Sequence, residues 1–530
     1  MKKPSRQSNN KLSVLRWIDD HFLLGISLFL LVFIPLYPKW PLFDVLPGYI
    51  VRVRLEDFLI LGAVIIWGVY VLRGKVNFKK IPLAKPIAAY LAVGFLSVLS
   101  AIFITKTVYP EFIQIAKVFL HFFRRIEYFS LFFIFFSGLK SKKQVWLAIG
   151  LLYFVVLSVS IYGFGQKYLY WPAYSTMNRE FSKGIVLYLT EHARVLSTFG
   201  GHYDLAAYIM LTLPVLIVIS FLTKKAWVKI GLWLVSLIEF WLLILTASRT
   251  SFIAYLVAVS VIFSLLALKK DKFWALGRWA AVVGLSVLIM ASFGDLSERF
   301  VHILRLEQIK NAVTSPFRHP PVNGIPIDES LPLEEQLKRV ASKSDAPPSK
   351  VRPGAEEKPA DVYFEPYYYG DQSDKGGEGG RSYSENALRF GLSTGIRMDA
   401  LWPRAWAGFK RNPLLGTGYS TLVKTHVWEF TQAESTDNDY LRLLGETGLL
   451  GFITFVSIFG VIIVWLYKAF VKSTELLLSG IFAAGIGITA GLMVNALYID
   501  VFEASKVAYA YWSLMGLFLA LAVIVIHEKK

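Results

Sequence analysis

Residues 434–452, ESTDNDYLRLLGETGLLGF, stand where a long polar segment ends and an apolar run begins. The apolar run continues to about residue 466, which predicts a membrane-spanning helix. Acidic and amide residues crowd the part of the stretch before the apolar run, namely Asp437, Asn438, Asp439 and Glu446. Acidic groups at the mouth of a membrane helix are unfavourable unless they face water, a partner or a substrate. We therefore expect the chemistry of this protein at this boundary.

The composition of the chain excludes an ordinary soluble domain. Of its 530 residues, 55% are hydrophobic, and the mean hydropathy is positive. The net charge of +18 invites a nucleic-acid-binding interpretation, but the Lys and Arg residues lie mainly in short loops beside apolar runs. This placement indicates membrane topology instead, so we expect no nucleic-acid partner. The chain has no cysteine, which excludes disulfides, thiolate catalysis and Cys-ligated metals.

Apolar runs of about 17–22 residues predict an all-α polytopic membrane protein with about twelve transmembrane helices. The expected spans are residues 21–37, 57–72, 86–104, 118–138, 145–164, 204–222, 230–247, 251–268, 273–293, 449–467, 475–496 and 507–526. No small-residue cleavage site follows the first run, which we interpret as a retained span and not a signal peptide. Basic loops alternate with less basic ones, so we expect a multi-pass protein of the cytoplasmic (inner) membrane with both termini in the cytoplasm.

The spans divide the chain into three parts: helices 1–9 in residues 1–293, one large extracytoplasmic loop in residues 294–448, and helices 10–12 in residues 449–530. Within the loop, residues 316–384 are rich in Pro, Gly, Ser and charge, which predicts a flexible insertion. Apolar periodicity returns after this insertion, so we expect helices within residues 386–425.

Four stretches on the expected outer face carry a family resemblance. They are RVLSTFGGHYDLAAYIMLTLP (194–214), LTASRTSFIAY (245–255), GIRMDALWPRAWAGFKRNPLLGTGYS (395–420), and Asn438 followed after nine residues by Gly448-Leu-Leu-Gly451. Together they resemble the O-antigen ligase/polymerase family of bacterial membrane glycosyltransferases, over about residues 190–470. One departure is clear, because Asp437 stands where ligases of this family carry a His proposed as the catalytic base.

The resemblance implies a metal-independent glycosyltransferase of surface polysaccharide assembly in the cell envelope. Such an enzyme takes a glycan from a polyprenyl-diphosphate carrier, such as undecaprenyl diphosphate, and transfers it to an acceptor hydroxyl at the extracytoplasmic face. The expected partners are this donor, a glycan, lipid or protein acceptor, and the bilayer. The resemblance implies no cofactor and no nucleotide sugar. The Asp in place of His tilts the interpretation slightly from a ligase toward a polymerase-like member.

The reaction suggests roles for several charged residues. The leaving group is a lipid diphosphate, and the planar, permanently charged Arg side chain suits its oxygens. Preorganised cations aimed at developing charge supply a large part of many rate enhancements. We assign diphosphate binding to four residues, of which Arg249 is also a catalytic candidate: Arg194, Arg249, Arg397 and Arg125.

The acceptor hydroxyl must lose its proton, which requires a base near the anomeric carbon. Asp437 is the first candidate, and desolvation is able to raise its pKa toward the working range. His426, in the same outer segment, is a second catalytic candidate, and His202 is a third. The motif residues Asn438, Gly448 and Gly451 complete the predicted site.

Each of these residues also has a structural interpretation. Arg249 is equally placed to anchor the end of a span, and Arg194 to be an ordinary loop cation. The remaining alternatives are an ion pair of Arg397 with Asp399, an ion pair of Arg125 with Glu127, a helix N-cap at Asp437-Asn438, and turn or close-packing positions for the glycines.

The main alternative function is a twelve-span secondary transporter. Transporters of that kind predict two similar halves with interrupted helices in matching places. Here the spans split nine and three around the outer loop. A non-catalytic scaffold that presents the loop to partners is a third hypothesis, and it leaves the outward-facing arginines unexplained.

Overall fold

The computed structural model describes residues 6–46, 49, 51–177, 180–190, 193–292, 392–424, 426–427 and 435–528. Most of the large loop predicted between the ninth and tenth spans, including the 316–384 insertion, lies outside the described residues. The described residues therefore cover the helical bundle and the last part of this loop.

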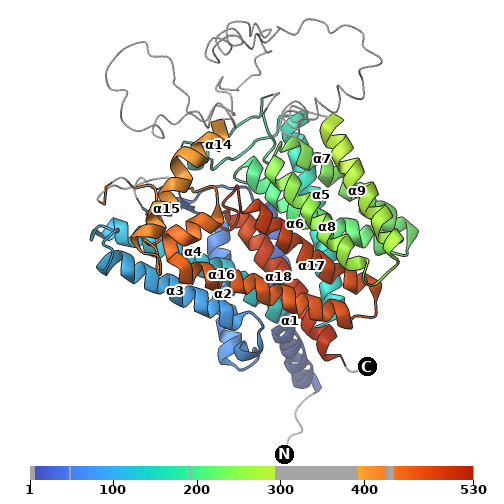
Figure 1. Ribbon diagram of the computed structural model, residues 1–530. Helices are drawn as coiled ribbons and strands as arrows, with labels where there is room; N and C mark the ends of the chain where they lie inside the picture. Colours follow the sequence, from blue (N-terminus) through green and yellow to red (C-terminus); the bar gives the residue numbers. More distant parts are fainter. Residues whose placement is uncertain are drawn as a thin grey trace, which may run out of the picture.

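Twelve long helices make up the described bundle (Figure 1). They are α1 (Arg6–Leu36), α2 (Leu55–Leu72), α3 (Ala84–Phe103), α4 (Phe112–Gly138), α5 (Lys142–Tyr168), α6 (His202–Leu222), α7 (Ala226–Leu245), α8 (Arg249–Leu266), α9 (Lys272–Ser292), α16 (Asp439–Lys472), α17 (Leu476–Asn495) and α18 (Ser505–His527). Eleven are long and apolar enough to cross a membrane. The other is α4, whose apolar sequence is interrupted by Arg124, Arg125 and Glu127. The predicted all-α polytopic fold is confirmed.

Shorter elements connect these helices. β1 (Phe43–Asp44) pairs antiparallel with β2 (Arg52–Val53), and single turns of 3-10 helix form η1 (Phe78–Lys80) and η2 (Phe181–Lys183). After the large loop come α14 (Leu392–Ile396), the π-helical turn η5 (Arg397–Leu401) and α15 (Trp402–Arg411).

The last helix of the loop, α15, ends at Arg411. The reason lies in the next residues, because Pro413 disfavours helical geometry at Asn412 before it. Gly416 and Gly418 then take positive φ angles of 67° and 92°, which build turns instead of helix. The turns that follow α15 contact α16, and they shape the floor of the site described below.

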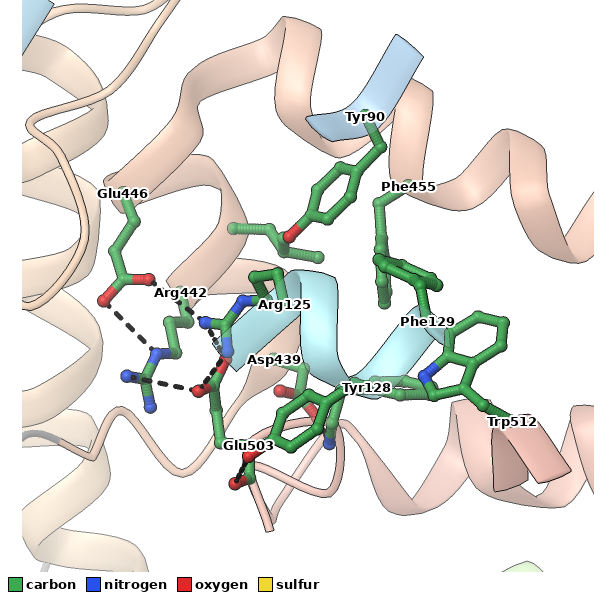
Figure 2. Close-up of a pocket in the computed structure, with 12 residues that line it drawn as sticks. Tyr90, Arg125, Tyr128, Phe129, Asp439, Arg442, Glu446, Phe455, Glu503 and Trp512 are labelled. Atoms are coloured by element: carbon green, nitrogen blue, oxygen red, sulfur yellow. Dashed lines mark hydrogen bonds and ion pairs between the residues drawn. The ribbon is translucent and has the colours of Figure 1, made fainter. Parts of the chain in front are cut away.

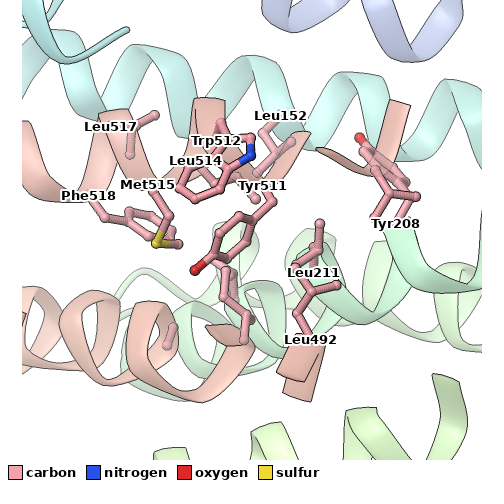
Figure 3. Packing of buried hydrophobic residues seen from close by; sticks show 14 of the residues in the cluster. Leu152, Tyr208, Leu211, Leu492, Tyr511, Trp512, Leu514, Met515, Leu517 and Phe518 are labelled. Carbon is pink, nitrogen blue, oxygen red and sulfur yellow. The ribbon is translucent and has the colours of Figure 1, made fainter. Parts of the chain in front are cut away.

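The centre of the bundle is formed by α6, α17 and α18, which bury most of their length. Figure 3 shows aromatic and aliphatic side chains of α18, among them Tyr511 and Trp512, packed toward Leu211 of α6 and Leu492 of α17. Small residues let the backbones of α17 and α8 approach closely. An added Cβ at Gly487 or Gly491 would overlap a carbonyl oxygen of α8.

The basic loops predicted on the cytoplasmic side meet at one end of the bundle. Lys142 lies 2.7 Å from Glu528, and Lys269 donates to the carbonyl of Val471 at 3.0 Å. Both termini also lie at this end in Figure 1, with α14 and α15 at the opposite side. We call this the basic end. The opposite end, where α6, α8, α16 and α18 begin, is the site end.

A break divides α16 into two helical limbs at Gly448, whose φ is 68° and ψ is −168°. The left-handed conformation favours glycine, and an added Cβ would overlap the backbone of Leu414 and Leu415. The N–H groups of Leu449 and Leu450 donate to the carbonyls of Pro413 (2.8 Å) and Leu414 (3.2 Å). The break therefore leaves these backbone donors satisfied. The span predicted from residue 449 is the second limb, and the acidic stretch forms the first.

Candidate functional site

The candidate base Asp437 stands immediately before α16 in a left-handed conformation, with a φ of 50°. Asn438 caps the helix, because its side-chain oxygen accepts from the N–H groups of Tyr440 and Leu441 at 3.0 Å each. The structural interpretation of Asn438 as an N-cap is therefore confirmed. The cap fixes where the helix begins, and so fixes the position of Asp437 beside it.

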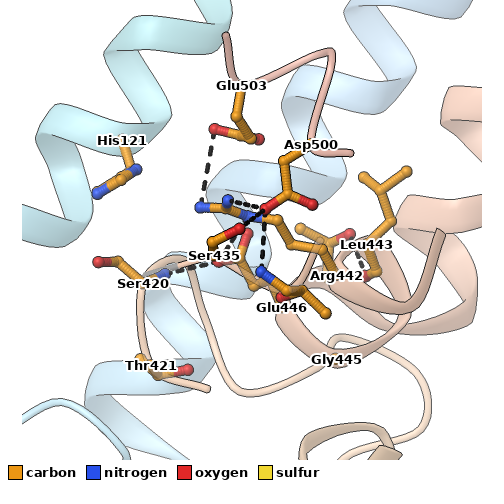
Figure 4. Close-up of polar contacts among 12 residues, drawn as sticks. His121, Ser420, Thr421, Ser435, Arg442, Leu443, Gly445, Glu446, Asp500 and Glu503 are labelled. Atoms are coloured by element: carbon orange, nitrogen blue, oxygen red, sulfur yellow. Dashed lines mark hydrogen bonds and ion pairs between the residues drawn. The ribbon is translucent and has the colours of Figure 1, made fainter. Parts of the chain in front are cut away.

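Asp500, in the connection between α17 and α18, holds the backbone on both sides of Asp437. Its carboxylate accepts from the N–H groups of Thr436 at 3.0 Å and Asn438 at 2.9 Å. The Ser435 hydroxyl lies 3.0 Å from Asp500 and 2.6 Å from Asp437. Arg442, one turn into α16, donates to the same carboxylate at 3.0 Å (Figure 4). Two segments that are far apart in the sequence are thus joined around the candidate base.

Arg442 and Arg125 connect two more acidic groups, Glu446 and Glu503, to this network. Arg442 lies 3.3 Å from Glu446 and 3.7 Å from Glu503, and Arg125 of α4 donates to Glu503 at 2.6 Å. Figure 2 shows these side chains around a cavity of about 20 Å³, which has room for roughly one water molecule. Because buried charges need partners, these ion pairs account for the charges that the network buries.

Arg397 forms the closest charged contact of Asp437. Its guanidinium lies 3.0 Å from the Asp437 carboxylate, donates to the Tyr498 carbonyl at 3.2 Å, and lies over the Tyr498 ring at 5.8 Å. The side chain of Arg397 is 10% exposed, whereas that of Asp437 is 35% exposed. In this pair the Arg397 guanidinium is buried, whereas solvent reaches the Asp437 carboxylate. The alternative pairing of Arg397 with Asp399 stays a prediction.

The surroundings of Asp437 change its acidity. Burial raises the pKa of the Asp437 carboxyl above its ordinary value, and the Arg397 guanidinium opposes this rise. The nearby Asp500 carboxylate adds to the rise, because like charges disfavour a second negative charge. A carboxylate with a raised pKa is a stronger base than a free aspartate, which suits removal of a proton from a hydroxyl.

Arg194 and Arg249 lie at the same end of the bundle as Asp437. The backbone N–H next to Arg194, at Val195, donates to Leu245 at the end of α7, four residues before Arg249. Arg249 begins α8, and Ser251 of that first turn is hydrogen-bonded to Asn495 at 3.1 Å.

Asn495 ends α17, and the carbonyl of the next residue, Ala496, accepts from the Asp439 N–H at 2.9 Å. The predicted arginines therefore stand on neighbouring elements. The cavity beside Arg442 and a larger one between α2 and α4 are lined by other residues and not by Arg194, Arg249 or Arg397.

Comparison with protein families identifies the region around this site. Residues 234–456 match the family described as O-antigen ligase. The chain carries an O-antigen ligase domain. The comparison with curated proteins found no match. The resemblance seen in the sequence motifs is thereby confirmed, and it supports a glycan-transferring role in polysaccharide assembly at a membrane.

The O-antigen ligase domain contains part of the predicted site. Arg249, Arg397, Asp437 and the motif residues lie inside residues 234–456, whereas Arg194 and Arg125 lie before them. The structure brings Arg397 and Asp437 into contact and leaves the roles of all these residues as predictions. Gly448 forms the break in α16, and an added Cβ at Gly451 would overlap the Thr447 side chain, as expected of turn and close-packing positions.

The structure also describes the surroundings of three other predicted residues. His426 is exposed in a bend of the loop before α16. His202 is buried at the start of α6, where its Nε2 lies 3.1 Å from Arg194. Arg125 pairs with Glu503, so its expected partner Glu127 is wrong; Glu127 instead pairs with Arg124 at 2.9 Å. The register of α4 explains this result, because Glu127 is three residues from Arg124.

Sequence reasoning missed Asp500, Glu503 and Arg442, which form the network beside the candidate base. Asp500 and Glu503 precede the last apolar run, which is the same acidic pattern at a helix mouth that singled out Asp437. That signal was therefore present. Among the described residues, no three His, Asp or Glu side chains lie close enough to share a metal ion.

Proposed function

We propose that this chain transfers a glycan from a polyprenyl-diphosphate carrier to an acceptor hydroxyl at the extracytoplasmic face, during assembly of a surface polysaccharide. The observation that carries the proposal is the 3.0 Å contact between Arg397 and Asp437 inside an O-antigen ligase domain. It pairs a cation suited to the departing diphosphate with a carboxylate suited to receiving the acceptor proton.

The proposed reaction is a single displacement. The acceptor oxygen forms a bond to the anomeric carbon, its proton passes to the Asp437 carboxylate, and the bond from the anomeric carbon to the diphosphate oxygen breaks. The diphosphate leaves with the electron pair. Arg194, Arg249 and Arg397 stabilise its negative charge, and arginines fixed before the reaction do so without reorganising. Arg125, already paired with Glu503, supports the site in this account and does not bind the diphosphate.

Arg397 couples donor binding to the base. In the free protein its guanidinium lowers the pKa of Asp437 against the rise caused by burial. A diphosphate that draws this guanidinium away removes that opposition, so the pKa of Asp437 rises further. The carboxylate then becomes a stronger base when the donor is in place. Premature proton uptake is limited as long as the ion pair persists.

The site end faces the outside of the cytoplasmic membrane in this proposal. The support is the concentration of lysines and arginines at the basic end, as the positive-inside rule predicts for a cytoplasmic surface. Donor and acceptor then meet where the long loop between α9 and α16 emerges.

Deletion of the gene tests the proposed function in cells. We expect lipid-linked glycan to accumulate and mature surface polysaccharide to disappear. Accumulation of single repeat units identifies a polymerase, and accumulation of full-length chains on the lipid identifies a ligase. Unchanged lipid-linked glycan together with unchanged surface polysaccharide contradicts both.

A further inference from the structure

A second, larger cavity lies between α2, α4 and the connection from α17 to α18. Its volume is about 550 Å³, within the range of roughly 300–1,000 Å³ common for ligand pockets. Its lining residues come from positions 39–204 and 503–505, outside the matched O-antigen ligase region. The Arg397–Asp437 pair does not line it.

The side of this cavity opens onto the lipid-facing surface of the bundle. Leu61 of α2 and Phe123 and Ile126 of α4 line it, and their side chains are 56%, 55% and 37% exposed. Both helices lie in the bundle, so apolar side chains exposed there contact lipid tails. A molecule able to enter from the bilayer therefore reaches the cavity sideways, with an apolar tail between α2 and α4.

The inner end of the cavity is polar and charged. Arg124 lies 2.7 Å from Asp57 and 2.9 Å from Glu127, and both carboxylates also line the cavity. The Arg54 side chain is 9% exposed, and its nearest carboxylate oxygen, on Glu56, is 3.9 Å away. Its buried Nε has no hydrogen-bond partner among the described residues. A buried donor of this kind calls for an acceptor from a bound molecule or water.

The balance of charge decides what kind of head group fits. Three cations line the cavity, Lys39, Arg54 and Arg124, against four carboxylates, Asp57, Glu127, Asp204 and Glu503. A diphosphate requires an excess of positive charge, which this lining lacks. Sugar hydroxyls both donate and accept hydrogen bonds, so they match alternating carboxylates and cations.

We propose that this cavity binds the hydroxyl-rich head of a lipid-anchored glycan, the acceptor of the reaction, with its tail against α2 and α4. The inference rests on the proposed function, because only a transferase requires an acceptor. Glu503 joins the two places: it lines the cavity and contacts Arg125 and Arg442. Arg442 in turn binds Asp500, which holds the backbone beside Asp437. One ionic network thus links the wall of this cavity to the backbone that holds the candidate base.

Photolabelling of the full-length protein in phosphatidylcholine vesicles tests the cavity. The probes are an alkyl glucoside with a diazirine in its tail and an alkyl phosphate with the same tail. We expect the glucoside to label peptides of α2 and α4 around Leu61 and Phe123. The Leu61→Trp side chain fills the opening of the cavity between α2 and α4. We expect it to lower the labelling roughly tenfold, because losing about 1.4 kcal/mol of binding free energy weakens affinity tenfold. Ile65→Trp is the matched control, because Ile65 lies one turn further along α2, is 60% exposed and does not line the cavity.

Two results overturn the proposal. One is glucoside labelling that is the same in Leu61→Trp and Ile65→Trp. The other is stronger labelling by the alkyl phosphate, which assigns the cavity to an anionic lipid and therefore to the donor. Photolabelling does not require glycan transfer, so its result tests binding in the cavity independently of the proposed function. Normal transfer by an Arg249→Ala variant contradicts the proposed function and leaves the labelling result in place.

Discussion

At the scale of single residues, Asp437 and Arg397 form the part of the site on which the chemistry depends. The sequence indicated both residues, and the structure adds the 3.0 Å contact between them. It also shows that Asp437 is held by its neighbours, since the Ser435 hydroxyl accepts from the Asp437 N–H and Asp500 binds the backbone of Asn438. The carboxylate has one exposed side, where an acceptor hydroxyl can approach.

The first prediction concerns Asp437→Asn. The amide keeps the size of the side chain and cannot accept the acceptor proton, so we expect transfer to fall about 100-fold or more. The measurement is the rate of glycan transfer by the purified protein from a polyprenyl-diphosphate-linked donor. Glu180→Gln serves as control, because Glu180 is 63% exposed in the α5–α6 connection. Equal rates in the two variants would remove Asp437 from the mechanism.

The second prediction concerns pH. Protonated Asp437 cannot act as a base, so the rate falls as the pH falls through its pKa. Burial raises that pKa, so the acid limb lies above the range of an ordinary aspartate. A pH–rate profile of the wild-type protein measures it. A midpoint near the ordinary histidine value of about 6.5 that disappears in His426→Gln would identify His426 as the base instead.

At the scale of elements, the first limb of α16 is held from two directions. Asp500 binds the backbone before it, and the turns after α15 contact its end, where the Gly445 and Glu446 carbonyls accept from Thr417 and Gly418 at 2.9 Å each. Sequence periodicity predicts the second limb, after Gly448, because its apolar run is long enough to span a membrane. It does not reveal the contacts of this segment with Asp500, which join residues more than fifty positions apart.

The third prediction concerns the break in α16. Gly448→Ala forces a Cβ into the backbone of Leu414 and Leu415 at a φ of 68°, and strain of this kind costs roughly 1–3 kcal/mol before the overlap is counted. We expect a lower midpoint of thermal unfolding in detergent. Gly460→Ala is the matched control on the same helix, where an added Cβ meets nothing within 4 Å. Equal midpoints would show that the break tolerates a side chain.

The fourth prediction concerns Asp500→Asn. Both carboxylate oxygens of Asp500 accept hydrogen bonds, one from Thr436 and Arg442 and the other from Asn438. An amide has a single acceptor oxygen, so one buried donor loses its partner, at about 1–3 kcal/mol. We expect both the unfolding midpoint and the transfer rate to fall. Asp44→Asn is the control, since the Asp44 side chain is 43% exposed. A rate that stays at the wild-type value contradicts a positioning role.

At the scale of the whole molecule, the sequence was sufficient for the architecture. Apolar run length and basic loops predicted the helices, because a bilayer imposes a minimum length on each span and every backbone group must be satisfied within it. The site was predicted only as a set of residues. The Asp500 contacts and the cavity beside Leu61 depend on which helices become neighbours, and that is decided by packing of the complete bundle.

The fifth prediction concerns orientation. The chain has no natural cysteine, so a single introduced one is a clean reporter. Glu180→Cys, in the α5–α6 connection, and Glu475→Cys, between α16 and α17, have side chains with similar exposures of 63% and 64% at opposite ends of the bundle. We expect a membrane-impermeant maleimide to label position 180 from outside the cytoplasmic membrane and position 475 only after that membrane is opened. The reverse pattern would invert the proposed topology.

The central claim is that arginines at the site end hold a lipid diphosphate while the glycan leaves it. The most direct measurement compares glycan transfer by purified Arg249→Ala with transfer by Arg278→Ala. Arg278 is a matched arginine whose guanidinium lies over Trp274 of α9, near the basic end. We expect a loss of about 100-fold or more for Arg249→Ala and little change for Arg278→Ala. Transfer by Arg249→Ala at the rate of the wild-type protein would contradict it.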